Sequence, residues 1–153
     1  MKKIIIIVGS IILVLGAIYY FFIREVRGTD ETFLIPQGFT GCVGIYYDQE
    51  GAKPLVKKED KIIYTIPKSG KLKTSSPQNF GWARTEDSGW HNQTFYYVNE
   101  EGKRVEKIPD EKIGYQYTNE SYSDSTGKTL RSYTFYVSEK KNKLPDTVEC
   151  KNY

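Results

Sequence analysis

The residues that could carry nucleophilic chemistry are few in this sequence. There are two cysteines, Cys42 and Cys150, and one histidine, His91. A cysteine activated by a neighbouring histidine is the nucleophile of many hydrolases, so Cys42 and His91 form one candidate catalytic pair. Against this reading, Cys42 lies inside a predicted strand, where thiols are usually buried and unreactive, and His91 lies in a polar loop beside Trp90. We therefore predict no catalytic residues and no enzyme activity, with a thiol-dependent hydrolase as the alternative.

Motifs for metals and cofactors are also missing from the sequence. It contains no HExxH, CxxC or DxDxDG motif, and one histidine falls short of the several ligands that a usual metal site requires. No glycine-rich loop joins a strand to a helix, which excludes nucleotide binding by that route. The acidic pairs Glu86-Asp87 and Glu100-Glu101 fall in predicted loops and turns, and adjacency in sequence is poor support for a glycosidase pair. We predict neither a metal nor a cofactor.

Aromatic side chains gather in and just after the longest predicted loop, which runs from Ser75 to Asn92. Aromatic residues in exposed loops stack on sugars or anchor protein partners. The candidate binding residues are Trp82, Trp90, Tyr96 and Tyr97. The alternative is that Trp82 and one face of the segment TFYYV, residues 94–98, fill the core of the domain. The predicted partner is a protein or a cell-wall polymer.

The charge balance excludes one class of partner. Two of the 22 basic residues are Lys2 and Lys3, and the 19 acidic residues all lie after them, so the chain from Arg24 onward is nearly neutral. A nucleic-acid surface needs basic residues gathered on one face. We predict no nucleic-acid partner.

The first 27 residues have the composition of a membrane anchor. After Lys2 and Lys3, the twenty residues from Ile4 to Ile23 carry no charge, and fourteen of them are Ile, Val, Leu or Phe. Twenty helical residues span about 30 Å, which is the hydrocarbon thickness of a bilayer. The apolar side chains favour insertion by about 4 to 8 kcal/mol. We predict a single-pass transmembrane helix, which makes the membrane a partner through Ile4 to Ile23.

A cleaved signal peptide is the alternative reading of this segment, and it would make the protein secreted. Cleavage follows a shorter apolar core and needs small residues, whereas this run ends in the bulky aromatic residues Tyr19 to Phe22. Aromatic residues at that position are typical of the membrane interface. Basic residues flank both ends of the run, so we infer the orientation from the short N-terminal tail. We expect the N-terminus inside the cell membrane and the domain outside it.

The two cysteines lie near the two ends of the predicted domain, and two states are open to them. Cys42 and Cys150 either form a disulfide or remain unpaired thiols, with Cys42 filling a small core position. A disulfide would close a loop of about 100 residues, which is worth around 4.7 kcal/mol in the chain-entropy model. Spacing in the sequence does not show whether the two Cα atoms approach within bonding range.

From Phe33 onward the sequence alternates between short strands and turns. Alternating apolar residues and turn signals predict the strands Cys42–Asp48, Ile62–Ile66, Lys71–Ser75, Thr94–Val98, Arg104–Ile108, Lys112–Thr118 and Thr129–Glu139. This pattern predicts an all-β fold, a small antiparallel β-sandwich of Ig-like or prealbumin-like type behind one N-terminal transmembrane helix. The expected organisation is an anchor over residues 1–27, a linker over 28–32 and an extracytoplasmic β-domain over 33–153.

Three segments, FLIPQGFTG, YTIPKSGKLKTSS and FGWA, together resemble a bacterial family of uncharacterised exported proteins, the domain of unknown function numbered 6843. The resemblance covers roughly Phe33 to Val137. It implies a bacterial, extracytoplasmic setting, but it brings no activity and no catalytic residues. Other members resemble lipoproteins or secreted proteins, and this chain departs from them by its apparent membrane span.

We therefore predict a membrane-anchored extracytoplasmic β-domain that serves as a non-catalytic binding or interaction module of the bacterial cell envelope. Two alternatives remain open. One is an envelope hydrolase that uses the pair Cys42 and His91. The other is a purely structural envelope component with no ligand.

Overall fold

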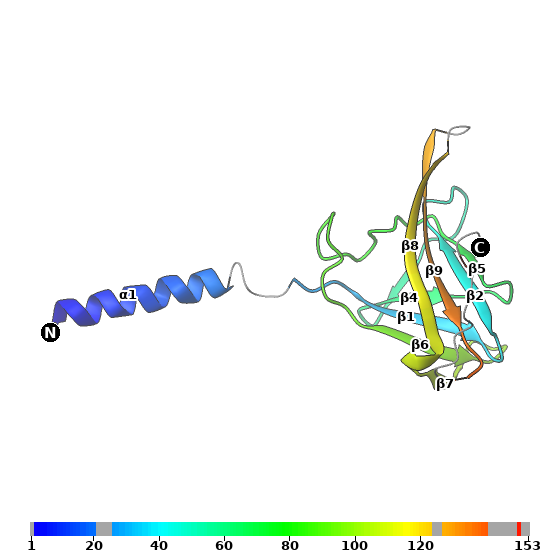
Figure 1. The fold of residues 1–153 in the computed structure, drawn as a ribbon, viewed down its shortest axis with the longest axis horizontal. Coiled ribbons are helices and arrows are strands. Elements are labelled where there is room, and N and C mark those ends of the chain that lie inside the picture. Colours follow the sequence, from blue (N-terminus) through cyan, green and yellow to red (C-terminus); the bar gives the residue numbers. More distant parts are fainter. Residues whose placement is uncertain (1, 21–25, 124–126, 141–149, 151–153) are drawn as a thin grey trace.

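The computed structural model describes residues 2–20, 26–123, 127–140 and 150 of the chain. A helix, α1 (Lys2–Ile18), forms the N-terminal end (Figure 1). The predicted span continues to Ile23, and its last three residues lie outside the described part. Within the described residues, no helix combines the length and the apolarity that crossing a membrane requires. The predicted single-pass anchor stays a prediction.

The described strands form two sheets (Figure 1). The five-stranded sheet has the order β3 (Val56–Lys58), β4 (Lys61–Thr65), β1 (Asp30–Pro36), β6 (Gln93–Val98) and β7 (Arg104–Ile108). The four-stranded sheet has the order β5 (Lys71–Lys73), β2 (Gly41–Tyr46), β9 (Lys128–Val137) and β8 (Ile113–Ser123). A 3₁₀ turn, η2 (Asp110–Lys112), joins β7 to β8. The mostly β architecture agrees with the predicted all-β class.

The pairing within the sheets differs from the expected antiparallel arrangement. Strand β1 lies between β4 and β6 and runs parallel to both, and β5 runs parallel to β2. The remaining pairs, β3 with β4, β6 with β7, β2 with β9 and β8 with β9, are antiparallel. Both sheets are therefore mixed, because the chain returns by crossovers instead of hairpins to place β4 and β6 beside β1 and β5 beside β2. The Ig-like or prealbumin-like type stays a prediction.

Aromatic rings join the two sheets in one core. Phe33 on β1 stacks between Tyr64 on β4 and Phe95 on β6, with ring centroids 4.6 and 4.7 Å away. Phe135 on β9 meets the edges of Phe33 and Phe95 at 5.5 and 5.3 Å. Edge-to-face pairs of this kind add about 0.5–1.5 kcal/mol each beyond the area that they bury. The alternation of Val43, Ile45 and Tyr47 also leads into this core, where all three are buried.

The start of the β-domain lies earlier than predicted. Strand β1 begins at Asp30, so that residues 30–32 of the expected linker belong to the sheet. Upstream of it, Val26 to Thr29 is already held by backbone hydrogen bonds to the long loop. Apolar content alone placed the boundary at Phe33, because Asp30 and Glu31 look like linker residues in the sequence.

A disulfide joins the two cysteines. The sulfur atoms of Cys42 on β2 and Cys150 are bonded, and the two Cα atoms lie 5.6 Å apart. Cys150 is fully buried. The bond ties the C-terminal end of the chain to the four-stranded sheet across a separation of 108 residues.

Candidate functional site

The long loop that the sequence predicts between Ser75 and Asn92 is fixed to the segment that precedes β1. The amide of Trp90 donates to the carbonyl of Val26 at 3.0 Å, and the amide of Gly28 donates back to Trp90 at 3.1 Å. The amide of Thr29 donates to the carbonyl of Gly81 at 2.9 Å. These hydrogen bonds extend the backbone pairing of β1 beyond the sheet and fix the loop to the segment before β1.

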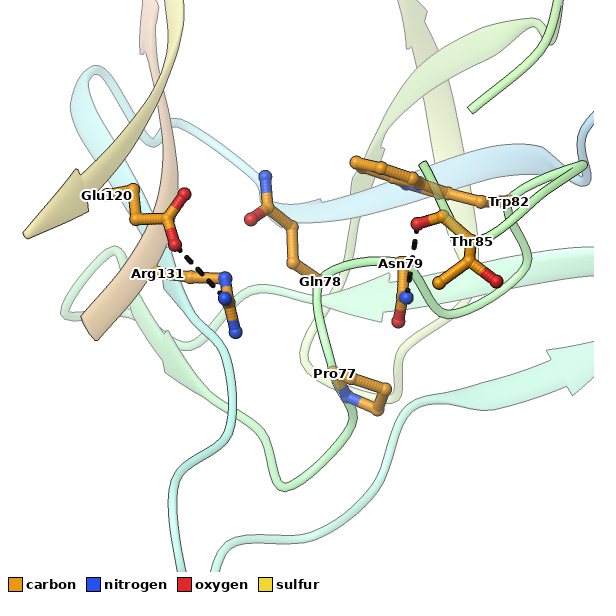
Figure 2. Close-up of a pocket in the computed structure, with 7 residues that line it drawn as sticks. All are labelled: Pro77, Gln78, Asn79, Trp82, Thr85, Glu120 and Arg131. Atoms are coloured by element: carbon orange, nitrogen blue, oxygen red, sulfur yellow. Dashed lines mark hydrogen bonds and ion pairs between the residues drawn. The ribbon is translucent and has the colours of Figure 1, made fainter. Parts of the chain in front are cut away.

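An outer hollow of about 340 Å³ lies between this loop and the β8–β9 hairpin. Its lining combines one aromatic ring and one proline with polar side chains: Pro77, Gln78, Asn79, Trp82, Thr85, Glu120 and Arg131. Figure 2 shows the Gln78 side chain lying between the Arg131–Glu120 pair and Trp82. The Arg131 Nη2 atom donates to Glu120 Oε1 at 3.0 Å, and Asn79 Nδ2 donates to the carbonyl of Thr85 at 3.4 Å. The volume falls in the range of about 300–1,000 Å³ that is usual for small-molecule sites.

A smaller inner pocket of about 140 Å³ adjoins the outer hollow, and the two share Gln78 and Trp82. The inner pocket lies between the loop and the ends of both sheets. Its lining residues are Glu31, Tyr47, Gln78, Trp82, Ser88, His91, Gln93, Thr118 and Tyr133. The parallel register of β1 and β6 places Glu31 directly beside Gln93.

Glu31 is the hydrogen-bonding centre of the inner pocket. The Tyr64 hydroxyl donates to Glu31 Oε1 at 2.9 Å, and the Gln93 amide donates to Oε2 at 2.8 Å. The Glu31 side chain is only 14% exposed. Tyr133 extends the network, since its hydroxyl lies 3.3 Å from Gln93 Oε1 and 2.6 Å from Gln116 Oε1.

His91 faces the same carboxylate. Its Nδ1 atom lies 3.0 Å from the carbonyl oxygen of Gly89, and its Nε2 atom lies 3.7 Å from Glu31 Oε2. Because a carbonyl only accepts hydrogen bonds, Nδ1 carries the proton in this contact. A neutral His91 therefore presents an unprotonated Nε2 toward the inner pocket.

The tyrosines around Glu31 are neutral phenols. Burial raises the pKa of Tyr47, Tyr64 and Tyr133 well above the ordinary value of 10.0, and the negative charge of Glu31 raises each of them further. A phenol in these surroundings acts as a hydrogen-bond donor and does not ionise near neutral pH. The carboxylate of Glu31 is thus the group that brings negative charge to the inner pocket.

The four aromatic residues predicted to bind do not form one site. Trp82 lines both cavities. Trp90 is 54% exposed and stacks against Arg27, whose guanidinium carbon lies 5.0 Å from the ring centroid. Tyr97 is buried, and its hydroxyl donates to the carbonyl of Phe39 at 3.3 Å. Tyr96 lies beneath Arg104 at 4.7 Å, on the other face of β6.

The polar residues of the site were not found from the sequence. Glu31, Gln78 and Gln93 form its centre, while Glu120 and Arg131 come from the final hairpin. One signal was present, since Glu31 stands two residues before the apolar run that begins at Phe33, where a charged side chain needs a partner once the strand is buried.

The candidate catalytic pair is wrong. Cys42 shares a disulfide with Cys150, and there is no free cysteine in the described residues. The thiolate that a Cys–His mechanism needs is therefore missing. His91 faces Glu31 instead of a sulfur atom.

Comparison with known proteins gives the family. A family model described as "Family of unknown function (DUF6843)" matches residues 27–145. The chain belongs to this family. The resemblance found in the sequence segments is confirmed, and the match extends on both sides of the range from Phe33 to Val137.

The DUF6843 domain also has a counterpart among solved structures. A crystal structure described as a "Putative Lipoprotein" from Bacillus anthracis is 23% identical, with a TM-score of 0.62. The alignment covers 80% of this chain and 85% of that chain. This likeness shows that the fold recurs in another protein. The comparison with curated proteins gives no match.

Proposed function

We propose that this DUF6843 domain is a non-catalytic binding module of the bacterial cell envelope and that it binds a polar cell-wall polymer. The observation that carries the proposal is the pair of adjoining cavities that share Gln78 and Trp82. An aromatic ring offers a face on which a sugar can stack, and the amide, carboxylate and guanidinium groups around it match sugar hydroxyls. Two cavities in series suit a chain of linked units better than a single small molecule.

The location outside the cytoplasm is part of the same proposal. Disulfides persist in oxidising compartments and are rare in the cytosol, which favours an exported position for the bonded Cys42 and Cys150. The structural counterpart from Bacillus anthracis is described as a lipoprotein, which is a membrane-attached class. For this chain we propose attachment through Ile4 to Ile23, with the N-terminus inside and the domain outside.

Binding to isolated cell-wall polymer tests the proposal. The full-length oxidised protein in detergent is sedimented with purified wall material, and the free fraction gives an affinity. We expect Trp82→Ala to weaken binding at least tenfold, because truncation of a hot-spot tryptophan costs about 2 kcal/mol or more and a tenfold loss corresponds to about 1.4 kcal/mol. Trp90→Ala is the matched control, since Trp90 lines neither cavity and should leave the affinity unchanged.

Two outcomes separate the alternatives. Absence of binding by the folded wild-type protein contradicts the proposal and favours a purely structural component. Equal loss in Trp82→Ala and Trp90→Ala places the contact on the exposed loop surface and not in the cavities. Circular dichroism and thermal unfolding of each variant show whether a loss of binding reflects a loss of fold.

A further inference from the structure

The inner pocket holds a carboxylate without a strong counter-charge. No lysine or arginine is among the described residues that line it. In the described part of the chain, the ion-pair partner found for Glu31 is His91, at 3.7 Å. The closer contacts, from Tyr64 and Gln93, come from neutral donors. Burying a charge is costly unless it is paired, so a cation in the pocket would be favoured.

Glu31 retains the capacity to accept further hydrogen bonds. A carboxylate offers about four lone-pair sites on its two oxygens. Tyr64 occupies one site on Oε1, and Gln93 occupies one on Oε2. A neutral His91 adds its unprotonated Nε2 atom beside Oε2. These acceptors converge on one small volume, which suits a donor with several N–H bonds.

The walls of the inner pocket suit the same kind of group. Trp82, Tyr47 and Tyr133 line it together with the carboxylate, and aromatic faces attract cations through their quadrupoles by about 0.5–2 kcal/mol. The phenols stay neutral because burial and the Glu31 charge hold their pKa values high. The other polar walls, among them Ser88 and Thr118, supply uncharged oxygen acceptors.

We propose that the inner pocket binds a primary ammonium group, with Glu31 as its counter-ion, carried by a polymer that lies in the outer hollow. The inference rests on the proposed function and names its ligand class, an amine-bearing polymer such as an amino sugar chain. A volume of about 140 Å³ corresponds to between four and five waters at ~30 Å³ each. That space admits an ammonium group and the edge of the sugar ring that bears it, while the rest of the ring lies toward the larger outer hollow.

Two oligosaccharides of equal length test the ammonium preference, one built from glucosamine and the other from N-acetylglucosamine. Each is titrated against the full chain at neutral pH and constant ionic strength, with Trp fluorescence and calorimetry as readouts. We expect the wild-type protein to bind the amine form at least tenfold more tightly. Glu31→Gln should lose the preference, and both forms should then bind about equally. Trp82→Ala should weaken the binding of both forms.

Glu86→Gln is the matched control for general charge effects. Glu86 is exposed in the same long loop and lines neither cavity, so its loss removes one negative charge near the site without changing either cavity. We expect this variant to keep the preference for the amine form. Equal loss of preference in Glu86→Gln and Glu31→Gln would overturn the assignment to Glu31.

A second measurement keeps the inference testable if Glu31→Gln unfolds. Methylammonium chloride should displace the amine oligosaccharide from the wild-type protein, and sodium chloride at the same ionic strength should not. Equal displacement by the two salts overturns the inference. Wild-type protein that binds both oligosaccharides equally also overturns it, while polymer binding itself stands. Methylammonium that perturbs Trp82 in a protein without affinity for wall polymer supports the pocket and contradicts the proposed function.

Discussion

Tyr64 on β4 hydrogen-bonds the Glu31 carboxylate on the neighbouring strand β1 at 2.9 Å, and both side chains are shielded from solvent. Tyr64→Phe keeps the aromatic packing against Phe33 but removes the donor. Since hydrogen bonds to charged groups are worth about 1.5–3 kcal/mol, we expect the free energy of unfolding to fall by that amount. Urea denaturation measures it. Tyr122→Phe is the control, because Tyr122 is 67% exposed and should change stability by less than about 0.5 kcal/mol.

Equal stability of Tyr64→Phe and the wild-type protein would show that Glu31 is satisfied by other groups. In that case the argument that this carboxylate lacks a sufficient partner would also need a different basis. The Tyr64 result therefore informs both the fold and the proposed ammonium site.

The Asp30 carboxyl makes the stability of the protein depend on pH in the acid range. The backbone amide of Asn92 donates to Asp30 Oδ1 at 3.0 Å and, with the Asn92 side chain and Arg27, holds the pKa of this carboxyl below its usual 3.8. A depressed pKa in the folded state stabilises the protein above the unfolded pKa, and this contribution is lost as the pH falls through the folded value. We expect Asp30→Asn to be less stable than the wild type near neutral pH.

The difference between Asp30→Asn and the wild type should shrink as the pH falls below about 4. Chemical denaturation of both proteins across pH 7 to about pH 2.5 measures it. A stability difference that stays constant over this pH range would contradict the role of the Asp30 charge. The wild-type carboxylate gains a proton over this range, whereas the amide in the variant does not.

Some residues of the site could be predicted from the sequence and others could not. Trp82 was predicted from its type and loop position, and it does line both cavities. Glu31 was assigned to a linker, because its partners Tyr64 and Gln93 lie 33 and 62 positions away in the chain. Hydrophobic periodicity reports which residues are buried, but it does not report which polar groups a crossover brings together.

At the scale of elements, alternation and turn chemistry placed most strands. β7 coincides with its predicted bounds, and β2, β4 and β6 differ from theirs by one or two residues. The three-residue strand β3 was missed because it is exposed throughout and carries no alternation. The parallel pairs around β1 were missed because local sequence favours hairpins between consecutive strands and has no signature for a crossover.

The shape of the long loop depends on Gly89. Its φ angle is +66°, and a Cβ atom there would lie 2.5 Å from the carbonyl oxygen of Val26 and 2.7 Å from Ala83 Cβ. We expect Gly89→Ala to destabilise the loop through both strain and collision and to weaken polymer binding. Gly102→Ala is the matched control, since Gly102 has a similar φ of +75° but open space around it. Gly102→Ala should lower the free energy of unfolding only by the cost of placing an L residue in the left-handed region, which is about 1–2 kcal/mol.

Urea denaturation and amide hydrogen exchange of the loop compare the two glycine variants. Equal destabilisation would mean that the contact between the loop and the segment before β1 adds nothing to its shape. A larger loss in Gly89→Ala, with faster exchange at Trp90, would show that the loop and this segment form one unit.

At the scale of the whole molecule, a covalent link joins the buried Cys150 to the four-stranded sheet. The bond from Cys42 to the buried Cys150 closes 108 residues, which include β3 to β9. The sequence could supply the two cysteines but not their approach, since the distance between them depends on how every intervening strand folds.

Removal of this link should lower stability more than any single side-chain change considered above. For a loop of about 100 residues, the chain-entropy model predicts a loss of about 4.7 kcal/mol, so we expect a double Cys42→Ala, Cys150→Ala variant to approach that loss. The wild-type protein with reductant should unfold at the same urea concentration as the double variant without it. Reduced and oxidised protein of equal stability would contradict a structural role. Because the cytosol keeps thiols reduced, a large loss would also tie the stable form of the domain to an oxidising compartment.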